Sequence, residues 1–350
     1  MDDTLELVNE AFTQNLGAIT NRREAFKLFY RNFRQIYETD EDAAFNNNYF
    51  DPITMETVAT YRPFICARPP NLKHRPREVT DIEAADRMRS WQDYQWYGQK
   101  MQAKRKKLSW FTALFGTGVL YHFYRKETST QKYKDFSGGK VVWKEREANK
   151  YDDPDSEVID VVNDFFPDDF GTDPDTCLNI IFRQYVHVDE IKRLSTGPDP
   201  WLTEKFAADK LLACSSPSDF SDKKTSYERF QDAKFVDLFK CGIVELLNYW
   251  ENDRLVIVAN RTFVLRDTPN PYHVKRKPFT IFVDEDNPAE LWGIGEAEIL
   301  VKTQHVLNTV GRMHIDAAKR QLRQLFISQI GSDLDPGAMY DEEGYTTETA

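Results

Sequence analysis

The sequence predicts an α+β fold in which long helices flank a strand-rich central region. Amphipathic helical patterns occupy residues 4–37 and 81–115. Between residues 119 and 283, short runs rich in Val, Ile, Tyr and Phe alternate with segments rich in Gly, Pro, Asn and Asp, which is typical of antiparallel strands. Residues 292–327 contain no proline, which predicts a helix roughly 45 Å long.

The composition is that of a globular, acidic protein. The chain has 350 residues, enough for two or three domains, and 41% of them are hydrophobic and 29% charged. Lys plus Arg number 46 against 57 Asp plus Glu, so the net charge is -11. Phosphate neutralisation dominates nucleic-acid binding, so this balance argues against a protein that simply grips DNA. An acidic protein can still enclose DNA without holding it.

The cysteine pattern and the first residues indicate a soluble protein made inside a cell. The four cysteines are widely separated and form no C-x-x-C pair, so we expect reduced thiols without a disulfide or zinc site. The first twenty residues are acidic and lack the basic start and apolar run of a signal peptide. No apolar stretch approaches the length of a membrane span, so we expect no membrane contact.

The N-terminal third is predicted to be helical. Residues 4–37 carry two apolar stripes and predict two helices joined near Thr20 and Asn21. A short apolar segment at residues 53–64 leads to an extended linker closed by Pro76. The sequence TDIE at residues 80–83 is a capping box, which predicts the start of one long helix over residues 81–115.

A basic cluster in this helix, Lys104, Arg105, Lys106 and Lys107, permits two interpretations. Four adjacent basic residues suit a nucleic-acid contact. The same cluster is also typical of a solvated helix face or a subunit contact, and this second interpretation is the more common one.

The central region is predicted to form strands. Residues 119–124 are expected to pair with residues 141–143 across Gly138 and Gly139. Residues 151–175 hold ten acidic residues, but the spacing of a calcium loop is missing, so we expect no metal site. The further predictions are strand-like residues 158–162, a strand at 179–187, helices at 188–194 and 201–212, a mobile insert at 215–227, a hairpin of 242–250 with 254–260, and strands at 261–266 and 279–283 that extend its sheet.

The helix predicted over residues 292–327 is amphipathic and polarised. Its apolar residues suggest one stripe facing a core. Acidic residues occupy its first turn and basic residues its second half, the order that suits the helix dipole. The stripe consists of Leu300, Leu307, Val310, Ala317, Leu322 and Leu325, and the charged residues are Glu296, Glu298, Arg312, Lys319, Arg320 and Arg323.

Catalytic motifs are absent from the sequence. It contains no phosphate-binding G-x-x-x-x-G-K-[ST] loop, no G-x-S-x-G elbow and no H-E-x-x-H pair. Gly293 and Gly295 begin like a dinucleotide fingerprint, but Glu298 stands where the third glycine is required. The six histidines are scattered and suggest no metal ligand set. We therefore expect no enzyme activity and no cofactor.

Several motifs, taken in order, resemble those of the portal proteins of tailed bacteriophages. The resemblance covers about residues 25–345, and its most specific block includes the hairpin of residues 249–264 and the sequence LWGIGE. The motifs are FICARPP (64–70), FGTGV (115–119), VNDFFPDD (162–169) with DP (173–174), HVDEIK (187–192), KPF (277–279), LWGIGE (291–296) and LN (307–308).

The resemblance implies a ring, usually of twelve subunits, at one capsid vertex. Viral double-stranded DNA would be packaged and ejected through its channel. The implied partners are the terminase motor, the major capsid protein, scaffold proteins and tail adaptors, and the implied location is the virion after assembly in the bacterial cytoplasm. Residues 1–290 would form the wing, 291–327 a stem helix and 328–350 the start of a clip. Portal chains normally continue into a second stem helix and a crown, so the sequence corresponds either to part of such a chain or to a protein that is not a working portal.

On this mapping, Lys319, Arg320 and Arg323 are the candidates for facing the DNA channel. The alternative for them is salt bridging, for example between Asp316 and Arg320. Other functions also stay open: a structural head-tail ring that does not conduct DNA, an enzyme with an unrecognised carboxylate site, and a monomeric nucleic-acid-binding protein that uses residues 104–107.

Overall fold

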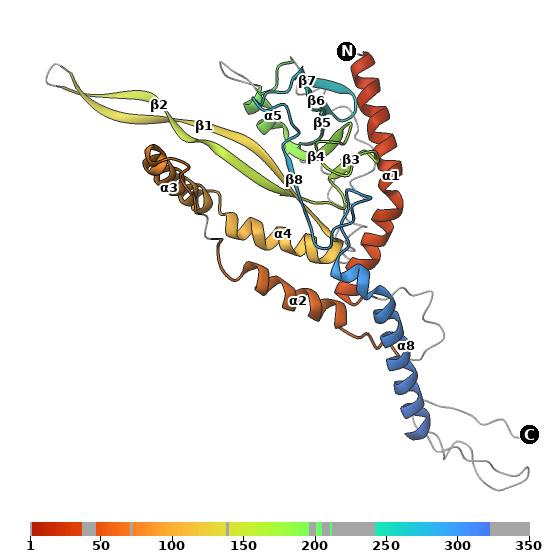
Figure 1. The fold of residues 1–350 in the computed structure, drawn as a ribbon. Coiled ribbons are helices and arrows are strands. Elements are labelled where there is room, and N and C mark those ends of the chain that lie inside the picture. Colours follow the sequence, from red (N-terminus) through yellow and green to blue (C-terminus); the bar gives the residue numbers. More distant parts are fainter. Residues whose placement is uncertain are drawn as a thin grey trace, which may run out of the picture.

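The fold is α+β, as predicted, and consists of a body with two antiparallel sheets and one helix that projects from it (Figure 1). The computed structural model describes residues 2–36, 47–70, 73–137, 140–195, 201–204, 211 and 242–322. The predictions for a helix at 201–212, an insert at 215–227 and a clip at 328–350 lie mostly or wholly outside these residues.

The eight described strands form two separate antiparallel sheets. The first contains β2, β1 and β8 in that order, and the second contains β3 to β7 in sequence order. The prediction that residues 279–283 extend the sheet of the central hairpin is wrong, because β8 pairs with β1. The strands are β1 (Thr117–Ser137), β2 (Lys140–Ile159), β3 (Phe165–Pro167), β4 (Ile180–His187), β5 (Ile243–Trp250), β6 (Arg254–Ala259), β7 (Phe263–Pro269) and β8 (Phe279–Val283).

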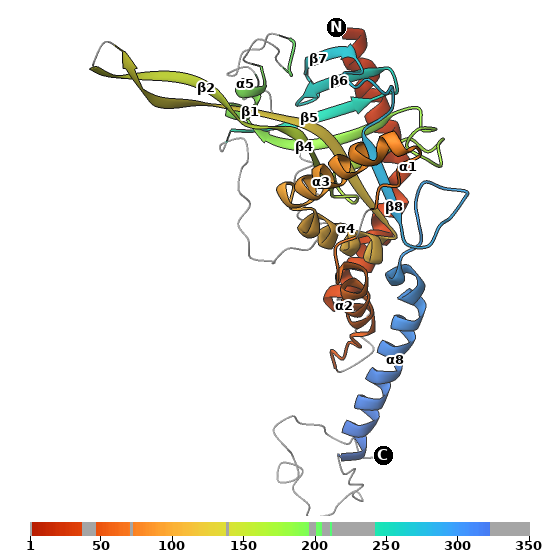
Figure 2. The same cartoon turned by 60° about the vertical axis from the view of Figure 1, so that its left-hand side comes forward.

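β1 and β2 form a hairpin arm that extends past the body (Figures 1 and 2). The turn between them was predicted, but the register was not: Val119 pairs with Ile159 and not with residues 141–143. β2 also ends at Ile159, earlier than the predicted strand of residues 158–162. The strands contain 21 and 20 residues. Their outer halves are rich in charged and polar residues and also expose Tyr133 and Trp143.

α1 (Asp2–Arg34) is one uninterrupted helix of 33 residues, so the predicted joint at Thr20 and Asn21 is wrong. The Thr20 hydroxyl donates to the carbonyl of Leu16 inside the helix. The buried side chains stay in phase on both sides of this point, at Val8, Phe12, Ile19, Phe26 and Phe29. A continuous stripe at helical spacing keeps the whole helix against the body.

Residues 53–64, predicted only as an apolar segment, belong to the helix α2 (Ile53–Cys66). The single helix predicted over residues 81–115 is divided into α3 (Ile82–Gly98) and α4 (Met101–Phe115). Lys100 has a positive φ of 53° and separates them. A short 3₁₀ turn, Val79–Asp81, precedes α3, and the capping box joins Glu78 with Asp81, two residues before the predicted one.

Three glycines let the end of α4, the start of β1 and the start of α8 (Glu296–Leu322) meet at one point. Gly116 ends α4 with φ +77°, as the sequence predicted, and a Cβ there would lie 2.2 Å from the carbonyl oxygen of Gly293. A Cβ on Gly295 would lie 2.4 Å from the nitrogen of Gly116. Close backbone approach therefore accounts for the G-x-G sequence of residues 293–295.

Aromatic side chains fill the core between the sheets and α1. Tyr121 of β1 lies 5.1 Å from Phe182 of β4 and 5.4 Å from Phe279 of β8, measured between ring centroids. Phe26 of α1 lies 5.8 Å from Trp292, at the root of α8. The root of the projecting helix is thus anchored in the main core.

Candidate functional site

The projecting helix α8 leaves the body at its first turns and extends away from both sheets (Figures 1 and 2). It packs against α2, α4 and α1. Tyr61 of α2 donates a hydrogen bond to Asp284, which follows β8. Burial raises the pKa of both groups above their ordinary values.

The face of α8 that packs on its own chain is polar. The Gln304 side chain accepts from the Thr54 hydroxyl at 2.8 Å and donates to the carbonyl of Asp51 at 2.6 Å. One turn later, Asn308 accepts from the backbone nitrogen of Asp51 at 2.9 Å. Arg312 donates to the carbonyl of Tyr49 at 3.1 Å. Gln304, Asn308 and Arg312 are all buried.

The opposite side of α8 carries exposed apolar residues at helical spacing. This outer stripe consists of Ile299, Val306, Val310 and Met313. The predicted core-facing stripe holds only in part: Leu300 and Leu307 are half-buried, whereas Val310 and Ala317 are exposed. Leu325 lies outside the described residues. The helix was correctly predicted as amphipathic, but three polar side chains, Gln304, Asn308 and Arg312, are turned inward.

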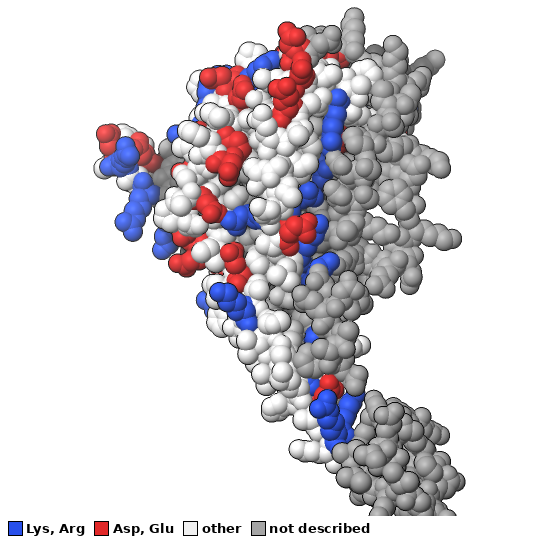
Figure 3. All heavy atoms as spheres, turned by 90° about the vertical axis from the view of Figure 1, so that its right-hand side faces the viewer, with Lys and Arg blue, Asp and Glu red and all other residues white. Residues whose placement is uncertain are grey.

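The described end of α8 is basic. Lys319 and Arg320, two of the predicted channel residues, are both exposed in its last turn. Figure 3 shows basic side chains gathered at this end of the molecule. Arg323 lies outside the described residues. Asp316, the predicted salt-bridge partner, accepts a hydrogen bond at 2.6 Å from Asn47.

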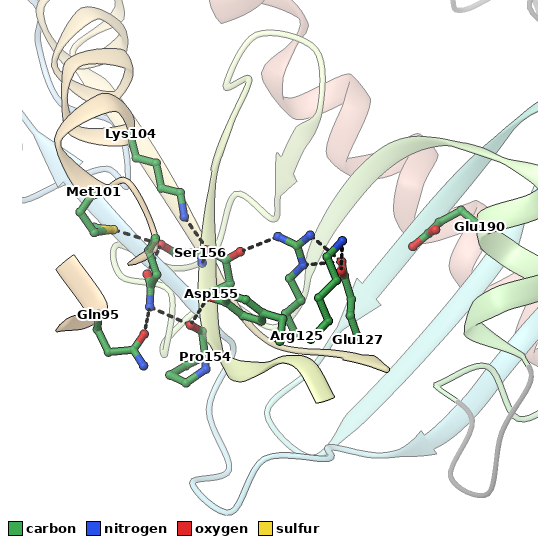
Figure 4. Close-up of polar contacts among 12 residues, drawn as sticks. Gln95, Met101, Lys104, Arg125, Glu127, Pro154, Asp155, Ser156 and Glu190 are labelled. Atoms are coloured by element: carbon green, nitrogen blue, oxygen red, sulfur yellow. Dashed lines mark hydrogen bonds and ion pairs between the residues drawn. The ribbon is translucent and has the colours of Figure 1, made fainter. Parts of the chain in front are cut away.

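The basic cluster of residues 104–107 lies on α4, at the root of the hairpin arm (Figure 4). Lys104 forms an ion pair of 2.5 Å with Asp155 of β2. Lys107 donates to the carbonyl of Val158 at 3.1 Å. Arg105 donates to the carbonyl of Arg68 at 2.8 Å. These three side chains hold β2 and the segment after α2 against α4.

The same network continues into the hairpin arm. Arg125 of β1 reaches Asp155 at 3.5 Å and donates to Glu127 at 2.8 Å (Figure 4). This hydrogen bonding lowers the pKa of Glu127 below its usual range. Lys104 and Arg125 therefore share one carboxylate, which ties α4 to both strands of the arm.

Lys106 and Lys107 are both exposed, but among the described residues the ammonium group of Lys106 has no partner. A nucleic-acid contact through residues 104–107 would have to rely mainly on this one side chain, because each neighbour already binds a group of its own fold. The arrangement fits a structural role for the cluster better than a phosphate-binding one.

Binding sites for small groups are not evident in the described part of the chain. No set of three or more His, Cys, Asp or Glu residues among the described residues is placed to hold a metal ion. No described helix is both long and apolar enough to cross a membrane. A comparison with protein-family models and one with curated proteins return no match for this chain.

Sequence reasoning did not predict the polar seam between α8 and α2. Gln304 and Asn308 are four residues apart, so a helical pattern places them on one face. No residue pattern identifies their partners, Asp51 and Thr54, about 250 positions earlier. A buried polar face can be recognised only after both segments are placed.

Proposed function

We propose that this chain is a subunit of a portal-type ring through which viral double-stranded DNA is packaged and ejected. The observation that carries the proposal is the orientation of α8. Its polar face is buried in the subunit while Ile299, Val306, Val310 and Met313 are exposed. An exposed apolar stripe on a projecting helix is typical of a protein interface.

Contacts between copies of a stem helix would cover this outer stripe. In a ring, each subunit contacts one neighbour with one surface and the other neighbour with a different surface. The outer stripe of α8 would be one of these two surfaces. The polar seam with α2 holds the helix at a fixed angle to the body. A fixed angle supports the proposal, because every copy must project in the same direction.

The charge distribution also supports passage of DNA in preference to tight binding. Each neutralised phosphate adds affinity, and affinity slows a moving duplex. A subunit with net charge -11 repels the DNA backbone. Lys319 and Arg320, exposed at the end of α8, would centre the duplex, and Arg323 is proposed for the same role.

The remaining parts of the proposal concern partners and location. The ring would sit at a capsid vertex, in contact with the major capsid protein, scaffold proteins, the terminase motor and a tail adaptor. In this proposal the motor supplies the ATP-driven step, and the ring itself performs no chemistry.

Mass photometry of the purified full-length protein, combined with negative-stain class averages, tests the proposal. We expect a ring of about twelve subunits with an open central channel. Val306→Ser on the outer stripe should lower the fraction assembled, and Lys302→Ala, an exposed change on the same helix, is the matched control. A protein that stays monomeric at micromolar concentration would overturn the proposal.

A further inference from the structure

α3 is attached to its own subunit by very few side chains. Of its 17 residues, Gln95 alone is buried. Gln95 donates to Asp153 at 3.0 Å, and Gln99, just after the helix, donates to the carbonyl of Pro154 at 2.7 Å. An isolated helix of this length is only marginally stable in water, and α3 has few packing contacts within the subunit, chiefly to α4.

The exposed side of α3 is aromatic. Tyr94 is 63% exposed, Tyr97 is 74% exposed, and Trp91 and Met88 are also exposed. Each step of three residues turns the helix by about 300°, so Trp91, Tyr94 and Tyr97 span roughly 120° of its surface, while Met88 lies on the side opposite Tyr97. Tyrosine and tryptophan are the side chains most enriched at the centres of protein interfaces.

The segment between α2 and α3 adds positive charge beside this aromatic side. Arg68, Lys73, Arg75 and Arg77 are exposed, and none of them forms an ion pair with another described residue. α3 itself carries two arginines against three acidic residues, a net charge of -1. The exposed aromatic side chains beside this positive charge fit a partner with apolar as well as acidic groups, so an acidic and apolar protein surface is a better complement than a DNA backbone.

Such a surface lies on the other side of the same subunit. The acidic loop, residues 168–178, connects β3 to β4 next to α1, whereas α3 lies across the body from it (Figure 1). It contains four aspartates, at 168, 169, 173 and 175, and no basic residue. Phe170 is 77% exposed within it, and Leu178 is also exposed.

The acidic loop is held in one conformation. The buried ammonium of Lys277 donates to the carbonyls of Cys177 at 2.7 Å and Pro174 at 3.1 Å. Asp168 accepts from the backbone nitrogen of Leu178 at 2.5 Å. A Cβ on Gly171 would lie 2.3 Å from the nitrogen of Cys177. A preorganised loop loses little entropy on binding.

A groove of about 400 Å³ lies between the acidic loop and α1. Its walls include Ala18 and Ala25 of α1, Phe170 of the loop, and Glu290. Arg22 also lines the groove and pairs with Glu290, so the aspartates of the acidic loop supply the negative charge that attracts a basic neighbour.

We propose that the aromatic side of α3 and the adjacent basic segment of one copy dock onto the acidic loop and groove of the next copy. This inference rests on the proposed ring and names the two surfaces that join its subunits. The surfaces differ and lie on opposite sides of one chain, so the contact is heterologous and propagates from copy to copy.

Mixing two assembly-deficient variants tests the proposal. The first variant, Tyr94→Ser with Tyr97→Ser, has an intact groove, and the second, Asp169→Lys with Phe170→Ser, has an intact α3. We expect each change to weaken subunit association by about 30-fold or more. An equimolar mixture should form heterodimers that stop at two copies, because one intact interface remains per pair. Mass photometry measures both results.

The controls separate this contact from loss of folding and from DNA binding. Tyr133→Ser removes an exposed tyrosine from the hairpin arm and should leave assembly unchanged. Circular dichroism should show native spectra for both double variants. Fluorescence anisotropy with a labelled duplex should show no loss of DNA binding in the α3 variant.

The other outcomes separate the docking from the portal function. Rings that persist in both double variants overturn the docking while leaving the portal function in place. Loss of duplex binding by the α3 variant with intact assembly would assign that face to nucleic acid. A wild-type protein that forms no ring refutes the portal function, and heterodimers in the mixture would still support the docking.

Discussion

Replacing Gln304 by alanine should detach α8 from the body without changing the outer stripe. Gln304 is 1% exposed and its side chain bonds to Thr54, Asp51 and Asn308. The change removes these bonds and leaves the Asp51 carbonyl and the Thr54 hydroxyl buried without them. Unsatisfied buried groups cost about 1–3 kcal/mol each, so we expect a loss of about 3 kcal/mol.

Hydrogen exchange of the α8 amides measures this loss directly. A loss of about 3 kcal/mol corresponds to roughly 150-fold faster exchange if α8 opens locally. The experiment uses a dilute sample in which mass photometry finds monomers. Val306→Ser, at a position that is 57% exposed, should leave exchange unchanged in the monomer and weaken assembly. Lys302→Ala should change neither quantity.

The opposite pattern would refute the reasoning. If Gln304→Ala exchanges within about threefold of wild type, a difference well below 1 kcal/mol, the polar seam does not hold α8. If Val306→Ser speeds exchange in the monomer, the outer stripe packs within the subunit and is not available to a neighbour.

Three further changes test the body. Gly116→Ala should prevent folding, as judged by circular dichroism, because its φ is +77° and its Cβ would lie 2.2 Å from the Gly293 oxygen. Lys277→Met should lower the urea midpoint, with a loss of about 2–3 kcal/mol, because two buried carbonyls lose their donor. The Arg254 hydrogen bond lowers the pKa of Asp267, so its stabilisation is complete above the unfolded pKa of about 3.9 and is lost as pH falls through the folded value. Asp267→Asn should remove this part of the acid dependence, which tryptophan fluorescence between about pH 5 and 2 can measure.

Local signals in the sequence predicted individual elements well. The predicted helix at residues 188–194 matches α5 (Val188–Leu194). His187 accepts from the backbone nitrogen of Asp189 there and caps the helix. The hairpin of β5 and β6 was also predicted, because both strands are rich in apolar residues and a polar segment separates them.

Predictions failed where distant contacts decide the outcome. Capping and periodicity do not separate α3 from α4, since the break at Lys100 depends on Gln95 and Gln99 reaching Asp153 and Pro154. The basic residues 104–107 form a dense cluster in the sequence, yet Lys104 and Lys107 bind β2. Sequence spacing identifies charges and does not identify their partners.

α8 shows why an apolar stripe alone does not identify a core. The spacing of apolar residues indicates which side of a helix avoids water. That side can be covered by the same chain or by another copy. Beyond the buried Ala297 at its root, the contacts of α8 with its own chain include hydrogen bonds donated by Gln304 and Arg312 and one accepted by Asn308. The sequence alone would assign these three side chains to the solvent face. One face of α8 makes polar contacts within the subunit, and the other exposes apolar residues. This arrangement fits a subunit whose packing is completed only in an assembly.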